Sequence, residues 1–249
     1  MAVKELAESK KRNPIIEFPE GVMLSHINDS RTARWAERQI FPERLWSTGS
    51  IEPSRHIENG LLARPQIEHL LRDKSVTVLS VNSGKRYFET LLVKGYGISP
   101  HQITVAGDDP FGNKEPSVVS RFGDVVKMDM FQKNWPLEGR HYDYVLVAGL
   151  GSVQERIVEN ALCLTGANGQ LRYDFHGLHG RVKNVLGRAL VYEKEIKFFE
   201  DLKKKLEKEY SPMAVDYDED LLIIERGTSS KDINLLPERS VARLRKEGY

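Results

Sequence analysis

Residues 76–84, VTVLSVNSG, begin the part of the chain that decides its fold. An apolar run with β-branched residues, 76–81, leads into small polar residues and a glycine, which is typical of a strand covered on both faces. Four later segments repeat this plan and carry a glycine or an acid at or next to their last residue: ITVAGDD, VVKMDM, YDYVLVAG and GQLRYDF. In open parallel sheets, ligands bind outside the carboxyl ends of the strands, where these polar residues fall.

Helical patterns separate these strand-like runs. Residues 85–94 and 153–163 have apolar side chains at helical spacing, and residues 191–209 form a long charged amphipathic pattern. Residues 64–72 are expected to form a helix with Pro65 at its first position. The further strands are expected at residues 103–106, 125–128, 144–148 and 170–173, with a closing strand pair at 214–216 and 221–225. Gly166, Asn168 and Gly169 are expected to form the turn before the fifth strand.

Composition places the chain among ordinary globular proteins. The 249 residues are 40% hydrophobic and 29% charged, with a net charge of +1, so there is no global attraction to nucleic acid or to anionic membranes. No stretch approaches the roughly 20 apolar residues of a membrane span, and the first residues lack the apolar run of a signal peptide, so we expect a cytoplasmic protein. Cys163 is the single cysteine, which excludes an intramolecular disulfide. Because it lies between Leu162 and Leu164, we expect it in the core.

Three regions are predicted. Residues 1–74 form a mainly helical extension, with one helix near residues 30–39, that is expected to cover the substrate side as a lid. Residues 75–227 form the α/β domain, and residues 228–249 form a basic tail. Nucleic-acid binding is weakly supported, because the basic clusters of the tail and of residues 10–12 are both small.

The order of parts resembles the class I S-adenosylmethionine-dependent methyltransferase fold, and three local matches carry this resemblance. VTVLSVNSGK occupies the place of that family's first strand and glycine-rich loop, and GRHYDYVLVAGLG is similar to its fourth strand. ALCLTGANGQLRYDF resembles the entry to the fifth strand. The resemblance implies a Rossmann-like, mostly parallel seven-stranded sheet with helices on both faces and an antiparallel closing strand. Asp143 falls at the family's acidic position in the fourth strand, where a structural role is expected.

The resemblance implies S-adenosylmethionine as cofactor, but the first motif is degenerate. The family's loop has the form D-x-G-x-G-x-G, and here Ser80 replaces the acid while Asn82 and Ser83 replace glycine. Gly84 is retained. Asn is the residue that best replaces glycine at a positive φ angle, so the loop is still expected to cradle the methionine part of the cofactor.

Acids at later strand ends complete the implied cofactor site. A carboxylate that binds both ribose hydroxyls is expected after the second strand, where Asp108 is preferred and Asp109 is the alternate. Asp129 matches the acid that meets the adenine amino group, and Met130 is expected to pack on the adenine ring. Ala148, after the fourth strand, is the remaining predicted cofactor contact.

The segment DFHGLHG, after the fifth strand, holds the catalytic candidates. His176 or His179 is predicted to act as general base on the acceptor, because an imidazole titrates near neutral pH, and Asp174 is predicted to orient it. The competing interpretation is a surface loop with two ordinary histidines. Two histidines without a third ligand do not define a metal site, and no metal is predicted.

Two functions of different classes remain open at this point. The first is a methyltransferase that acts on an unidentified small molecule, protein or RNA. The alternative is an inactive methyltransferase-like domain that serves as a binding or scaffolding module, since fold does not fix function. A nicotinamide-linked oxidoreductase is disfavoured because the G-x-G-x-x-G fingerprint is missing. The sequence does not predict an oligomeric state.

Overall fold

The computed structural model describes residues 60–82, 86–108, 122–148, 153–174, 185–209, 212–217 and 221–227. Several predictions from the sequence fall outside these ranges: the helix near residues 30–39, the basic tail, and the site residues Ser83, Gly84, Asp109, His176 and His179. The domain boundaries near residues 74 and 227 stay predictions.

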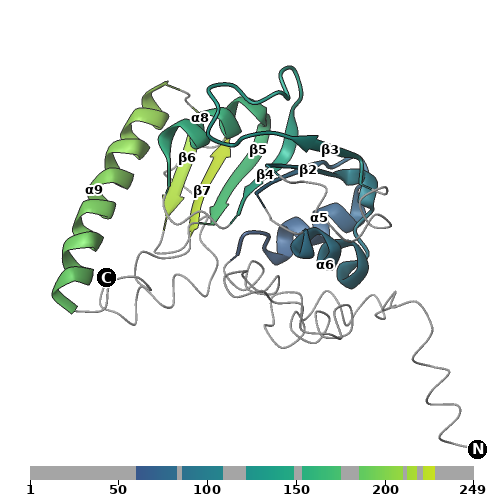
Figure 1. Cartoon of the computed structure of the whole chain (residues 1–249), viewed down its shortest axis with the longest axis horizontal. Coiled ribbons are helices and arrows are strands. Elements are labelled where there is room, and N and C mark those ends of the chain that lie inside the picture. The colour runs from purple at the N-terminus through teal and green to yellow at the C-terminus, as the bar shows by residue number, and fades with distance from the viewer. Residues whose placement is uncertain are drawn as a thin grey trace, which may run out of the picture.

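A mixed sheet forms the centre of the described part of the chain (Figure 1). Its seven strands are β1 (Val78–Val81), β2 (Ile103–Gly107), β3 (Asp124–Lys127), β4 (Tyr142–Val147), β5 (Thr165–Asp174), β6 (Met213–Tyr217) and β7 (Leu221–Arg226). The spatial order is β3-β2-β1-β4-β5-β7-β6. The pairings β1–β2, β2–β3, β1–β4 and β4–β5 are parallel, whereas β7 runs antiparallel to both β5 and β6. The predicted mostly parallel sheet with an antiparallel closing strand is confirmed.

Helices cover both faces of this sheet, as the sequence predicted (Figure 1). The helices α5 (Arg64–Arg72) and α6 (Tyr87–Tyr96) lie on one face, and α8 (Glu155–Leu164) and α9 (Val185–Glu209) lie on the other. A short 3₁₀ turn, Pro100–Gln102, leads into β2. None of the helices in the described ranges is long and apolar enough to cross a bilayer.

Each face has its own apolar core. On the first face, Ile67 and Leu70 of α5 and Leu91 of α6 are fully buried against strand residues such as Leu146. On the second face, α8 and α9 pack against strand residues that include Leu79, Val145, Leu171 and Ile224. The central strands are buried on both sides, which explains their continuous apolar sequences.

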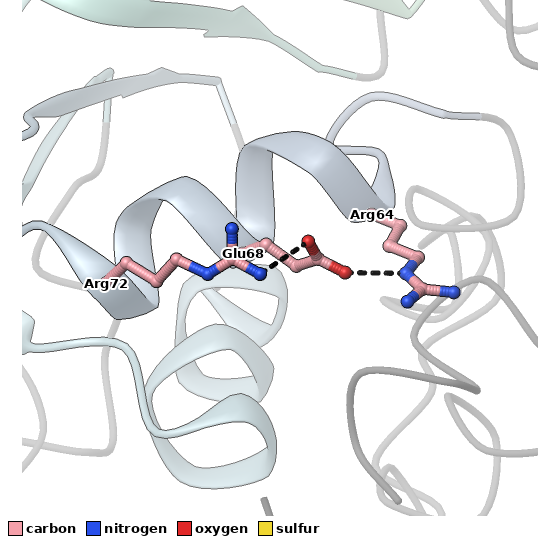
Figure 2. A network of polar contacts seen from close by, with 3 residues as sticks. All are labelled: Arg64, Glu68 and Arg72. Atoms are coloured by element: carbon pink, nitrogen blue, oxygen red, sulfur yellow. Dashed lines mark hydrogen bonds and ion pairs between the residues drawn. The ribbon is translucent and has the colours of Figure 1, made fainter. Parts of the chain in front are cut away.

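The helix α5 shows how local sequence sets an element. It begins and ends at the predicted residues, with Pro65 in its first turn, where the missing N–H costs nothing. Its outer face carries a network in which Glu68 accepts hydrogen bonds from Arg64 Nε at 2.6 Å and Arg72 Nη2 at 3.2 Å (Figure 2). Each such pair at i, i+4 spacing contributes only about 0.2–0.5 kcal/mol, so the buried face supplies most of the stability.

The start of β5 differs from the prediction. Gly166, Asn168 and Gly169 were expected in a turn, but β5 already begins at Thr165. Thr165 pairs with Tyr142, and regular pairing resumes only with Gln170 and Tyr144, so the glycine segment forms an irregularity within the strand. A Cβ at Gly169 would lie 2.9 Å from the carbonyl oxygens of Tyr142 and Asp143, so glycine is required by close backbone contact rather than by a turn.

The predicted burial of Cys163 is wrong, because its side chain is exposed. The buried side of α8 is formed by Ile157, Val158, Ala161, Leu162 and Leu164. Successive helical residues differ by about 100° in direction, so Leu162 and Leu164 lie at the two margins of the buried face and Cys163 points away from it. Apolar neighbours in sequence do not share a face in a helix.

Candidate functional site

The carboxyl ends of β1, β2 and β4 form the edge where the sequence places its candidate ligand-binding residues. From β1 the sheet continues to β2 on one side and to β4 on the other, so the strand order reverses at this point. Such a switch point is where open α/β sheets bind their ligands.

Asn82, immediately after β1, ties three strand ends together. Its backbone has a φ of 61°, the left-handed conformation predicted for a residue that replaces glycine. Its N–H donates to Ala106 O at 2.9 Å, and its side-chain Nδ2 donates to Ala148 O at 2.9 Å. Ala148 N in turn donates to Val81 O at 3.0 Å. The predicted cofactor contacts Asn82 and Ala148 are therefore neighbours, and they bond to each other.

Ser80 has a partner that the sequence reasoning missed. Its hydroxyl donates a hydrogen bond to Oε1 of Glu89, in the first turn of α6, and both residues are fully buried. Glu89 Oε2 is also buried, and it has no hydrogen-bond partner among the described residues. A glutamate in the first turn of a helix is common because it complements the helix dipole, so the sequence alone offered little signal.

The acids after β2 and β3 lie at the same edge. Asp108 directly follows β2 and is exposed. Asp129 is also exposed, and its Oδ1 accepts a hydrogen bond from Phe131 N at 2.8 Å. Met130 is only 2% exposed and packs in the second core, so the predicted contact with an adenine ring stays a prediction. Met128 N donates to Gly107 O at 2.9 Å, which joins the ends of the two strands.

The acceptor-side candidates are described only in part. Asp174 is the last residue of β5, is fully buried and pairs with Leu221 of β7. His176 and His179 lie outside the described ranges, so their predicted roles stay predictions. Within the described ranges, no three His, Cys, Asp or Glu side chains are grouped to hold a metal ion.

The opposite edge, at the amino ends of the strands, uses its acids differently. Asp143 Oδ2 accepts hydrogen bonds from Thr77 N at 2.8 Å and Thr77 Oγ1 at 3.1 Å, which confirms its predicted structural role. Asp124 bonds to Arg140, and that hydrogen bond holds the pKa of Asp124 below its usual range. A shallow hollow of about 410 Å³ near His101 and Arg140 also lies at this edge, far from the switch point.

A buried arginine fixes the beginning of the described chain to the sheet. Arg172 of β5 donates to Gly60 O from Nε at 3.0 Å and from Nη2 at 2.7 Å. Its Nη1 donates to Gln170 Oε1 at 3.1 Å, and Gln170 Nε2 donates to Glu225 Oε2 at 2.8 Å. Burial lowers the pKa of Arg172 to about 10. These contacts indicate a structural role for this residue, although it lies near the carboxyl end of β5.

No protein-family model and no curated protein matches the sequence. Solved structures similar to this chain include a methyltransferase of Podospora anserina with bound S-adenosylhomocysteine, at 13% identity and a TM-score of 0.42, with 85% of this chain and 98% of that chain covered. The magnesium protoporphyrin IX methyltransferase of Synechocystis with bound S-adenosylmethionine is 13% identical, with a TM-score of 0.39 and coverage of 83% and 96%. An O-methyltransferase family protein of Burkholderia thailandensis is 13% identical, with a TM-score of 0.40 and coverage of 84% and 73%.

Identity and TM-score are both low, so these likenesses support no inference about substrate or activity. The fold follows instead from the sheet itself: the reversal of strand order beside β1, the parallel strands on both sides of it, and the antiparallel strand β7 inserted between β5 and β6. This is the arrangement that the resemblance implied. The described part of the chain has the class I methyltransferase fold.

Proposed function

We propose that this protein is a methyltransferase that uses S-adenosylmethionine and acts on an acceptor still to be identified. The observation that carries the proposal is the switch point at β1 and β4, where Asn82 adopts a positive φ angle and brings three strand ends together. A parallel sheet that presents its loops in this way is suited to binding an extended nucleoside ligand across the strand ends.

The residues at this edge fit the chemistry of that cofactor. The exposed carboxylate of Asp108 is available to accept two charge-assisted hydrogen bonds from ribose hydroxyls, and the exposed carboxylate of Asp129 is the proposed acceptor for the adenine amino group. The loop that begins at Asn82 would hold the methionine part. The cofactor supplies the methyl group on its sulfonium, and the protein binds, aligns the acceptor and excludes water. Asp174, His176 and His179 remain the proposed acceptor-side residues.

A non-catalytic binding module is the second candidate, and one contact favours it. The side-chain amide of Asn82 already donates to Ala148 O, so one donor of the loop is used within the protein. Such a module would bind the cofactor weakly or not at all, or would bind it without methyl transfer.

Calorimetric titration with S-adenosylhomocysteine, with NAD as a parallel ligand, tests the proposal. We expect micromolar binding of S-adenosylhomocysteine and no binding of NAD. Asp108→Ala should weaken binding by roughly 1.5–3 kcal/mol, the range for hydrogen bonds to a charged group, and should leave stability nearly unchanged. If Asp109→Ala causes the loss instead, the ribose acid is Asp109.

Asp143→Ala is the matched control, because it removes an acid from the opposite edge of the same sheet. It should lower the free energy of unfolding by roughly 1–2 kcal/mol, since Thr77 loses its acceptor, and should leave the dissociation constant unchanged. Absence of S-adenosylhomocysteine binding to the unmodified protein would reject the methyltransferase proposal and favour the binding module.

A further inference from the structure

The contact between Ser80 and Glu89 places a carboxylate beneath the switch point. Ser80 is the penultimate residue of β1. It pairs with Val105 of β2 and with Leu146 of β4, so it lies between the two strands that flank β1. The chain passes from the end of β1 to the start of α6 within residues 82–86. The first turn of α6, with Glu89, therefore lies at the carboxyl edge, on the face that Ser80 points to.

This carboxylate is only half satisfied by the described chain. Oε1 accepts the hydrogen bond from Ser80, but Oε2 is buried without a partner among the described residues, and the whole side chain is 0% exposed. Buried polar atoms in native proteins are nearly always hydrogen-bonded, and a carboxylate carries a larger penalty than a neutral group when they are not. A cationic N–H donor at this edge would satisfy the remaining oxygen.

We infer that Glu89 binds the ammonium group of the amino-acid part of the ligand, with Ser80 as the positioning residue that holds the carboxylate. Glu89 would thus supply, from a helix, the negative charge that is missing from β1 at position 80. An ammonium group fits because it offers three donors and a full positive charge to a site shielded from water. This inference rests on the proposed function, since it takes S-adenosylmethionine as the ligand.

The chain has a cation of its own close by, so the test has to separate the two sources of positive charge. Arg86 precedes α6 with a φ of 62° and is 4% exposed. If a cation of the chain were the true partner of Glu89, loss of the carboxylate would disturb the loop and reduce the affinity of every ligand at this edge. If the ligand ammonium is the partner, only ligands that carry the ammonium would be affected.

The experiment compares two ligands on Glu89→Gln by calorimetry. S-Adenosylhomocysteine carries the amino-acid part, whereas 5′-methylthioadenosine has the same nucleoside without it. We expect Glu89→Gln to weaken the binding of S-adenosylhomocysteine about 10- to 100-fold, the range for one charged hydrogen bond. The dissociation constant of 5′-methylthioadenosine should change less than about twofold. Ser80→Ala should cause a smaller loss with the same selectivity.

Glu155→Gln is the matched control, because it makes the same change in the first turn of another helix, α8. It should change neither affinity. Equal weakening of both ligands by Glu89→Gln, or no weakening of either, overturns the role of Glu89 and leaves the proposed function in place. Failure of the unmodified protein to bind S-adenosylhomocysteine overturns the proposed function and this inference together.

A second measurement requires no variant, in case Glu89→Gln does not fold. The analogue of S-adenosylhomocysteine in which hydrogen replaces the α-amino group is titrated against the unmodified protein. We expect it to bind about 10- to 100-fold more weakly than S-adenosylhomocysteine, because the carboxylate then has no cation to meet. Equal affinity of the two compounds overturns the inference.

Discussion

The two edges of the sheet use the same kinds of residue for different purposes. At the amino edge, Asp143 binds Thr77 and Asp124 binds Arg140, so both carboxylates hold parts of the chain together. At the carboxyl edge, Asp108 and Asp129 are exposed, and Glu89 is buried with one oxygen that has no partner in the described ranges. This difference supports the proposal that the ligand binds at the carboxyl edge, whereas the contacts at the amino edge stabilise the fold.

This division has a physical basis in strand direction. Loops at the carboxyl edge connect strands to the helices that follow, and near β1 they diverge to opposite sides of the sheet. Among the described residues of this edge, the carboxylates of Asp108 and Asp129 are exposed. At the amino edge the strand entries converge, and short side chains such as Thr77 and Asp143 reach one another directly.

Arg172 is the described residue that fits this comparison least well. It lies near the carboxyl end of β5, but its contacts with Gly60 and Gln170 hold the chain together as the acids of the amino edge do. We expect Arg172→Met to lower the free energy of unfolding by roughly 2–4 kcal/mol, since Gly60 O and Gln170 Oε1 lose charged donors in a buried site. Urea denaturation measures this. A fully stable variant with impaired S-adenosylhomocysteine binding would instead make Arg172 a ligand residue and would break the comparison.

Two glycines, one at each edge of the sheet, allow the closeness of backbone packing at the two edges to be compared. A Cβ at Gly123, just before β3, would lie 2.4 Å from His101 O, whereas a Cβ at Gly107, at the end of β2, would meet only Asn82 backbone atoms at 3.8 Å. We expect Gly123→Ala to cost roughly 1–3 kcal/mol of stability, because the backbone has to move. Gly107→Ala should stay within about 0.5 kcal/mol of the unmodified protein. Thermal unfolding compares the two, and equal costs would contradict the close packing of the amino edge.

The ion pair between Asp124 and Arg140 is expected to have the smallest effect on stability. Because its pKa is lowered in the folded protein, the carboxylate contributes stability above its unfolded pKa of about 3.9, and that contribution is lost as pH falls through the lowered folded value. The two side chains are 39% and 51% exposed, so the contribution should be below about 1 kcal/mol. In Arg140→Met, the Asp124 pKa should rise toward its ordinary value in a carboxyl-detected NMR titration. An unchanged pKa would remove Arg140 as the cause.

Prediction from sequence succeeded where local signals decide the outcome. Pro65 and the spacing of Ile67 and Leu70 located α5 at both ends, and the apolar runs located the strands of the described sheet to within a few residues, except for the start of β5. It failed at Gly166 and Gly169, where glycine signals a turn in sequence but permits close contact with Tyr142 in the folded sheet. It also failed at Cys163, where apolar sequence neighbours indicated burial and helix geometry decided exposure.

The sequence by itself determined the α/β class, the parallel sheet with its antiparallel closing strand, and the edge at which Asn82 and Asp108 lie. The α/β class and the edge follow from periodicity and from the residues that end each strand, which are local properties, whereas the seven-stranded sheet with its antiparallel closing strand was implied by the resemblance to the methyltransferase fold. Only the tertiary structure brought Glu89 to Ser80 and the carbonyl of Gly60 to Arg172, because these contacts depend on how helices and strands pack. The carboxylate that contacts Ser80 therefore lies in the first turn of the following helix, where no pattern along the chain could assign it.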